Sequence, residues 1–73
     1  MNPESDSRAL SAIEDLVHLL QLAESAAQRV AQEVHGPLFD HAQLIERDLQ
    51  RLRRGAETLK RSIERSMGVQ EAA

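Results

Sequence analysis

Histidines, carboxylates and arginines are the side chains of this 73-residue chain that could do chemistry. His35 and His41 flank a Gly-Pro, Asp40 lies beside His41, and His18 lies far along the chain from both. Imidazole and carboxylate groups are ordinary metal ligands. No His-x-x-x-His pattern places two histidines on one helical face, however, so we expect no metal site and no cofactor.

Arginines follow a helical spacing in the second half of the chain. On a helix they would form one outer line, called here the arginine stripe: Arg47, Arg51, Arg54, Arg61 and Arg65. Such a line could contact phosphates or an acidic protein. It also fits a solvated helix face that is partly satisfied by intrahelical pairs such as Asp48 with Arg51. The net charge of −3 opposes avid nonspecific binding to nucleic acid.

The composition removes several classes of chemistry. The chain has no cysteine, which excludes disulfides, thiolate zinc sites and thiol catalysis. It has no Trp or Tyr and one Phe, so the aromatic platforms that stack single-stranded bases are missing. Neither a nucleophile–base pair nor a phosphate-binding loop is recognisable, and we expect that the protein is not an enzyme.

Apolar residues repeat in heptads in both halves of the chain, at alternating steps of three and four. This period is typical of helices that pack along a narrow seam. In the first half, position a is held by Leu10, Val17, Glu24 and Ala31, and position d by Ile13, Leu20, Ala27 and Val34. In the second half, position a is held by Ala42, Leu49, Ala56 and Ile63, and position d by Ile45, Leu52, Leu59 and Ser66.

The two seams match when the chain is folded back at Gly36-Pro37. Residues whose numbers sum to 76 then face each other, as Leu20 and Ala56 do, and large side chains mostly meet small ones. The sequence therefore predicts an all-α fold, an antiparallel two-helix hairpin that forms a single domain over residues 1–73. The expected core is Leu10, Ile13, Val17, Leu20, Ala27, Ala31, Val34, Ala42, Ile45, Leu49, Leu52, Ala56, Leu59 and Ile63.

Capping signals place the ends of the helices. Asn2-Pro3 is a start signal, and Gly36-Pro37 is a stop signal, so the first helix is expected over about 3–35. Asp40 is a candidate N-cap, with Gln43 three residues later and a Phe39–Leu44 staple. The prediction is a turn over 36–39, a second helix over 40–67 and a frayed tail over 68–73.

Glu24 and Gly55 break the pattern. Glu24 occupies an a position, and we expect it to reach Arg51 or Arg53 at the margin of the seam. A polar lock on helix register is the alternative. Gly55, inside the second helix, predicts a close approach of the two helices or a hinge.

The first helix carries a second apolar seam, at positions c and g. Its members are Ala12, Leu16, Leu19, Ala23, Ala26 and Val30. One hairpin partner covers only one seam, and soluble monomers rarely expose such a stripe. We therefore expect a second copy to pack helix 1 against helix 1 in a four-helix bundle, or a different helical protein to take the seam.

These features favour a noncatalytic protein–protein interaction module, such as an adaptor, a co-chaperone or an oligomerisation unit. The alternative is a small nucleic-acid-binding hairpin dimer that uses the arginine stripe. No membrane partner and no small-molecule substrate are expected. With no apolar run near the length of a membrane span and an acidic, polar start, a soluble cytoplasmic protein is the expectation, and the composition is typical of bacterial or phage proteins.

Overall fold

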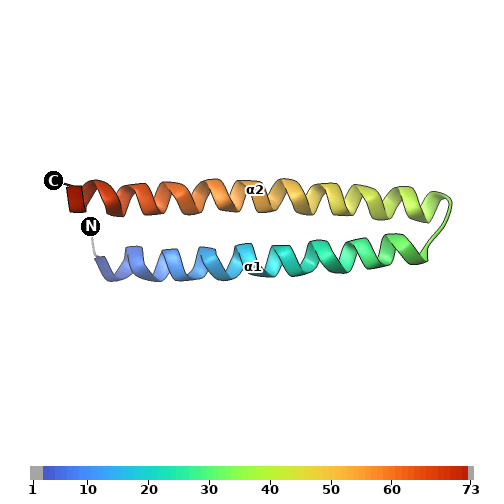
Figure 1. The fold of residues 1–73 in the computed structure, drawn as a ribbon, viewed down its shortest axis with the longest axis horizontal. Helices are drawn as coiled ribbons and strands as arrows, with labels where there is room; N and C mark the ends of the chain where they lie inside the picture. Colours follow the sequence, from blue (N-terminus) through green and yellow to red (C-terminus); the bar gives the residue numbers. More distant parts are fainter. Residues whose placement is uncertain (1–2, 73) are drawn as a thin grey trace.

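The protein is a long antiparallel hairpin of two helices that lie side by side along their whole length (Figure 1). The computed structural model describes the backbone of residues 3–72 and the side chains of residues 4–68. Helix α1 spans Pro3–Glu33 and helix α2 spans Pro37–Ala72. The molecule measures 56 × 14 × 14 Å. The predicted all-α hairpin is confirmed.

The turn is tighter than predicted and occupies residues 34–36. Gly36 has a φ of +64°, and its carbonyl accepts hydrogen bonds from the backbone N–H groups of Phe39 at 3.0 Å and Asp40 at 3.3 Å. Helix α2 thus begins at Pro37, whose missing N–H costs nothing in the first turn. The predicted start at Asp40 is wrong. Asp40 lies in the first turn instead, where its charge favours the helix N-terminus. The predicted cap Asn2 lies outside the described residues.

Helix α2 also ends later than predicted. It continues through Gly68 to Ala72 instead of stopping near Met67. A glycine ends a helix when it adopts a positive φ, and Gly36 is the glycine of the described chain that does so. The expected frayed tail is therefore helical as far as Ala72, and Ala73 lies outside the described residues.

Helix α1 presents its predicted a/d seam to α2. Helix α2, however, is rotated about its own axis by about 50° relative to the predicted pairing, so that positions a and e face α1 instead of positions a and d. Positions a of α2 remain in the interface, with Ala42 and Ala56 buried. The side chains beside them are those of position e, namely Glu46, Arg53 and Lys60, which are half-buried. The predicted d residues Ile45, Leu52 and Leu59 are exposed in the hairpin, and their assignment to its core is corrected.

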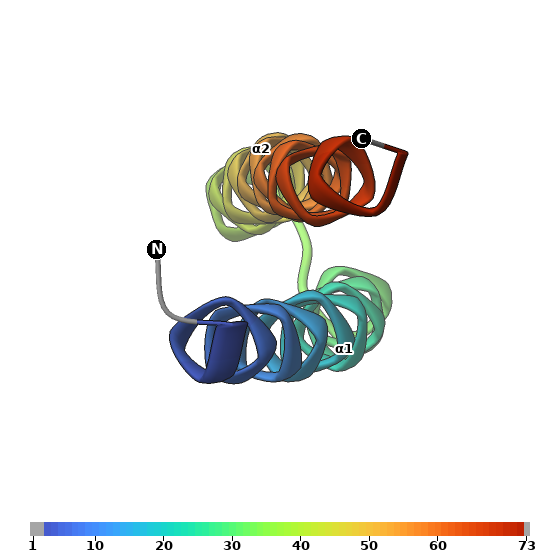
Figure 2. The same ribbon diagram turned by 90° about the vertical axis from the view of Figure 1, so that its left-hand side faces the viewer.

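The core of the hairpin is small. Among the residues that the structure describes, the buried apolar side chains are Ile13, Ala31, Ala42 and Ala56. Leu10, Val17, Leu20, Ala27, Val34, Leu49 and Ile63 line the same interface and are half-buried. The core is small because each helix has only one neighbour. Figure 2 shows the two helices side by side, so that most of the surface of each helix faces away from the other. Three of these four buried apolar residues are alanines, so the interface holds little apolar volume.

Candidate interaction surfaces

Glu24 fixes how the two helices face each other. It is 9% exposed, and its carboxylate accepts a hydrogen bond and ion pair from Nε of Arg53 on α2. Arg53 also donates through Nη1 to Glu57, one turn further along α2. Hydrogen bonds to the two carboxylates raise the pKa of the Arg53 guanidinium. The sequence predicted a partner for Glu24 at Arg51 or Arg53, and the structure shows that the partner is Arg53.

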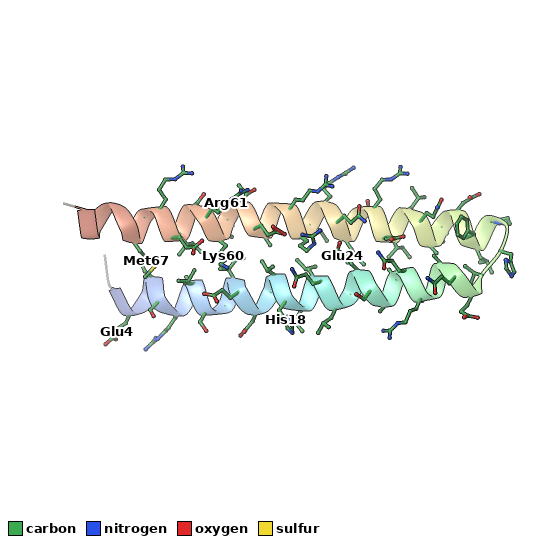
Figure 3. All side chains as sticks on the ribbon, viewed as in Figure 1. Glu4, His18, Glu24, Lys60, Arg61 and Met67 are labelled. Atoms are coloured by element: carbon green, nitrogen blue, oxygen red, sulfur yellow. The ribbon has the colours of Figure 1, made fainter. Side chains whose placement is uncertain are left out.

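The ion pair joins position a of α1 to position e of α2, and the rest of the seam follows this offset. The numbers of Glu24 and Arg53 sum to 77, not 76. Continued along the heptads, this offset places Val17 level with Lys60 and Leu10 level with Met67, and Lys60 and Met67 are half-buried. Figure 3 shows Lys60 and Met67 directed toward α1, whereas Arg61 points away from it. The rotation of α2 therefore extends along the described part of the helix.

The side of the hairpin that carries this ion pair is polar. Close to the turn it has a shallow, open hollow lined by Gln28, Ala31, Gln32, Phe39, Gln43 and Glu46. Further along the same side lie the Glu24–Arg53–Glu57 bonds. The hollow is too open to enclose a small ligand, and amide and carboxylate groups dominate its rim. This side is therefore a solvated face.

The opposite side of the hairpin is apolar. Helix α1 contributes positions g and c there, and helix α2 contributes position d. The exposed large side chains on this side, called here the apolar face, are Leu16, Leu19, Val30, Leu38, Ile45, Leu52 and Leu59. The predicted second seam of α1 and the displaced d residues of α2 thus form one continuous surface that spans both helices.

The alanines of the predicted second seam lie within this face. Ala23 and Ala26 are half-buried, and Ala12 is exposed. Leu19 and Leu52 are the most exposed long side chains near its middle, at 60% and 59%. The sequence predicted the part of the apolar face that α1 contributes. It did not predict the part that α2 contributes, because the heptad pattern assigned the d residues of α2 to the core of the hairpin.

Gly55 lies at the edge of the apolar face and does not mark a close approach of the two helices. A Cβ at this position would meet nothing within 4 Å, and the residue is exposed. The prediction that Gly55 permits close packing of α2 against α1 is therefore wrong. On the helix surface Gly55 lies between Leu52 and Leu59, at spacings of three and four, so it leaves a gap in the line of leucines.

The arginine stripe lies on the outer ridge of α2, away from α1. Arg47, Arg51, Arg54, Arg61 and Arg65 are all exposed. Arg53, which forms ion pairs with Glu24 and Glu57, is not part of the stripe. Arg61 donates to the hydroxyl of Thr58 at 3.3 Å, and that hydroxyl donates to the carbonyl of Arg54 at 3.0 Å. The expected pair of Asp48 with Arg51 does not form.

The histidines are dispersed. His18, His35 and His41 are exposed, and Figure 3 shows His18 on the outer side of α1. Among the residues whose positions are described, no three His, Asp or Glu side chains are grouped closely enough to hold a metal ion. The described helices include none with the length and apolarity to cross a membrane.

Comparisons with known protein families, with curated proteins and with solved structures give no match to the chain. The geometry of the hairpin and the chemistry of its surfaces are accordingly the grounds for a functional proposal.

Proposed function

We propose that the protein is a noncatalytic interaction module that binds other helices through its apolar face. The single observation that carries this proposal is the exposure of leucine, isoleucine and valine side chains on both helices of one side. Exposed apolar patches of this extent mark interaction surfaces in soluble proteins. The polar opposite side and the solvated arginine stripe leave this face as the surface with the largest gain from burial.

The surface area of the chain supports the same proposal. A compact folded monomer of 8.2 kDa exposes about 4,500 Å², whereas the hairpin exposes 5633 Å². The excess is of the order of the area that one partner contributes to a standard protein interface, about 800 Å². The hairpin therefore has surface to lose to a partner, and an adaptor, a co-chaperone or an oligomerisation unit would use it in this way.

Cysteine labelling tests the proposal without knowledge of the partner, because the chain has no cysteine of its own. Leu52→Cys lies on the apolar face and Leu44→Cys on the outer ridge of α2, at similar exposures of 59% and 54%. In an extract of cells that produce each variant, we expect maleimide to modify Leu44→Cys at least tenfold faster. Denaturation should abolish the difference. Equal rates in the native extract would contradict the proposal.

A second candidate function is binding of nucleic acid by a hairpin dimer. The observation in its favour is the absence of carboxylate partners for the arginine stripe among the described residues. Arg51→Glu with Arg54→Glu should then abolish binding, leave the helical content unchanged and remove a steep dependence of affinity on salt. Binding of RNA or DNA that survives this double change would exclude the stripe as its site.

A further inference from the structure

We infer that the occupant of the apolar face is a second copy of this chain, bound so that the turns of both copies lie at the same end. This inference rests on the proposed function and names its partner. In the resulting four-helix bundle, Leu19 of each copy packs into the gap above Gly55 of the other. The shape of the face, the levels of its residues, the charges of the helices and the gap at Gly55 each favour this arrangement.

The shape of the face fits another hairpin better than a single helix. Its apolar side chains form two lines, one on α1 and one on α2, and both lines run along the hairpin. Two further helices placed opposite complete a four-helix bundle, in which every helix buries two neighbouring faces. A single partner helix placed between the two lines would leave the outer edges of both lines exposed.

The levels of the apolar residues also match those of a second copy. By the offset of the Glu24–Arg53 pair, three apolar residues of α1 lie within about 3 Å, two residues of helical rise, of the level of an apolar residue of α2. These pairs are Leu16 with Leu59, Ala23 with Leu52, and Val30 with Ile45. A two-fold axis parallel to the helices preserves these levels. Each α1–α2 pair of apolar residues then lies opposite the same pair of the other copy, so that apolar side chains meet apolar side chains.

The charges of the helices select the arrangement with both turns at the same end. Residues 1–37 hold two arginines and six acids, a net charge of −4, whereas residues 38–73 hold seven basic and six acidic side chains, a net charge of +1. With the turns together, each acidic α1 lies beside the basic α2 of the other copy. With the turns at opposite ends, α1 would lie beside α1 and α2 beside α2, which places like charges together.

Gly55 provides the independent observation. Inside a helix a glycine is less favourable than alanine, and the hairpin itself gives no steric reason for it, because a Cβ there meets nothing within 4 Å. Leu19 is the most exposed side chain of the α1 line. The offset of the Glu24–Arg53 pair places it at the level of the Leu52–Leu59 stretch of α2. In the same-end bundle, Leu19 of one copy meets the gap between Leu52 and Leu59 of the other.

The experiment begins with the mass of the purified 73-residue chain, measured by light scattering behind a sizing column over a range of concentrations. We expect twice 8.2 kDa. Gly55→Ala should raise the dimer dissociation constant at least tenfold, although alanine favours the helix. The matched control Gly68→Ala, which is also exposed with nothing within 4 Å of a Cβ, should leave this constant within a factor of two. Unchanged or tighter association of Gly55→Ala would overturn the packing of Leu19 against Gly55.

A spin label on His35→Cys, in the exposed turn, reports the arrangement. Turns at the same end place the two labels within about two interhelical spacings, roughly 20 Å. A distance near the 56 Å length of the hairpin would overturn the same-end arrangement. A chain that stays monomeric would overturn the whole inference. If the chain is monomeric but Leu52→Cys is protected from maleimide in the extract, the proposed function stands with a different partner. If Leu52→Cys is not protected, both the proposed function and this inference are wrong.

Discussion

At the scale of single residues, Glu24 has the largest influence on the structure. A carboxylate that is 9% exposed needs a partner, and Arg53 supplies one across the interface. Arg53 is held in turn by Glu57, so its guanidinium is aimed before it meets Glu24. Because these bonds raise the pKa of Arg53, its contribution to stability is complete below the ordinary arginine pKa and is lost only in strongly alkaline solution.

A double-mutant cycle tests this ion pair. We expect Glu24→Gln and Arg53→Gln each to lower the melting temperature, because each change leaves one charged group without its partner across the interface. The double variant should lose less than the sum of the two losses, since its two amides are both uncharged. Thermal unfolding followed by circular dichroism at fixed protein concentration measures all four proteins. Strictly additive losses would show that the pair is not coupled.

At the scale of the elements, the rotation of α2 follows from the ion pair. Arg53 reaches Glu24 only if position e of α2 turns toward α1, and the long stems of Lys60 and Arg53 can cover apolar surface there while their charges stay near water. Positions a of α2 stay in the interface after this rotation, because a is the neighbour of both d and e. The leucines of position d leave the interface and join the apolar face.

Engineered disulfides distinguish the two rotations of α2. The offset of the Glu24–Arg53 pair places Val17 level with Lys60, whereas the sequence pairing places it opposite Leu59. Under mild oxidation at low protein concentration, Val17→Cys with Lys60→Cys should close within the chain at least severalfold faster than Val17→Cys with Leu59→Cys, because a disulfide needs Cα atoms within about 7 Å. Loss of maleimide reactivity gives the two rates. Faster closure of the second pair would restore the sequence pairing.

The turn between the helices depends on Gly36. Its φ of +64° is a conformation that residues with a Cβ adopt at a cost of about 1 kcal/mol. We therefore expect Gly36→Ala to lower the free energy of unfolding by about that amount, measured by urea denaturation. Gly68→Ala, within α2, should raise it by up to about 1 kcal/mol. The same sign for both variants would contradict the roles assigned to the two glycines.

At the scale of the whole molecule, the small core and the large apolar face have the same cause. Two helices cannot bury four apolar lines against each other, and this chain carries two on α1 and two on α2. The a/d line of α1 and the a line of α2 pack against each other in the hairpin. The other line of each helix lies on the apolar face. Stability of the folded chain should thus depend on what covers that side, and therefore on protein concentration if the partner is a second copy.

Aspartate substitutions test the face as a whole. Leu19→Asp places a charge within it, whereas Leu22→Asp places the same charge on the side of α1 away from α2, at a similar exposure of 60% against 54%. We expect Leu19→Asp to weaken association at least hundredfold, about 3 kcal/mol, and Leu22→Asp to leave it within a factor of three. Light scattering of dilution series measures both. Equal effects of the two variants would show that association does not use the apolar face.

The sequence by itself determined the two helices, the hairpin, the seam of α1 and the need of Glu24 for an arginine on the facing helix, either Arg51 or Arg53. It could do so because heptad spacing, Gly-Pro punctuation and the need of a carboxylate for a partner are local rules. It left the rotation of α2 about its own axis undetermined, since positions d and e both adjoin position a and either can complete a seam with it. Only the tertiary structure decided between them, because the charge on Glu24 selects Arg53 across the interface and thereby turns Ile45, Leu52 and Leu59 outward. The same choice joined two separate apolar lines into one face.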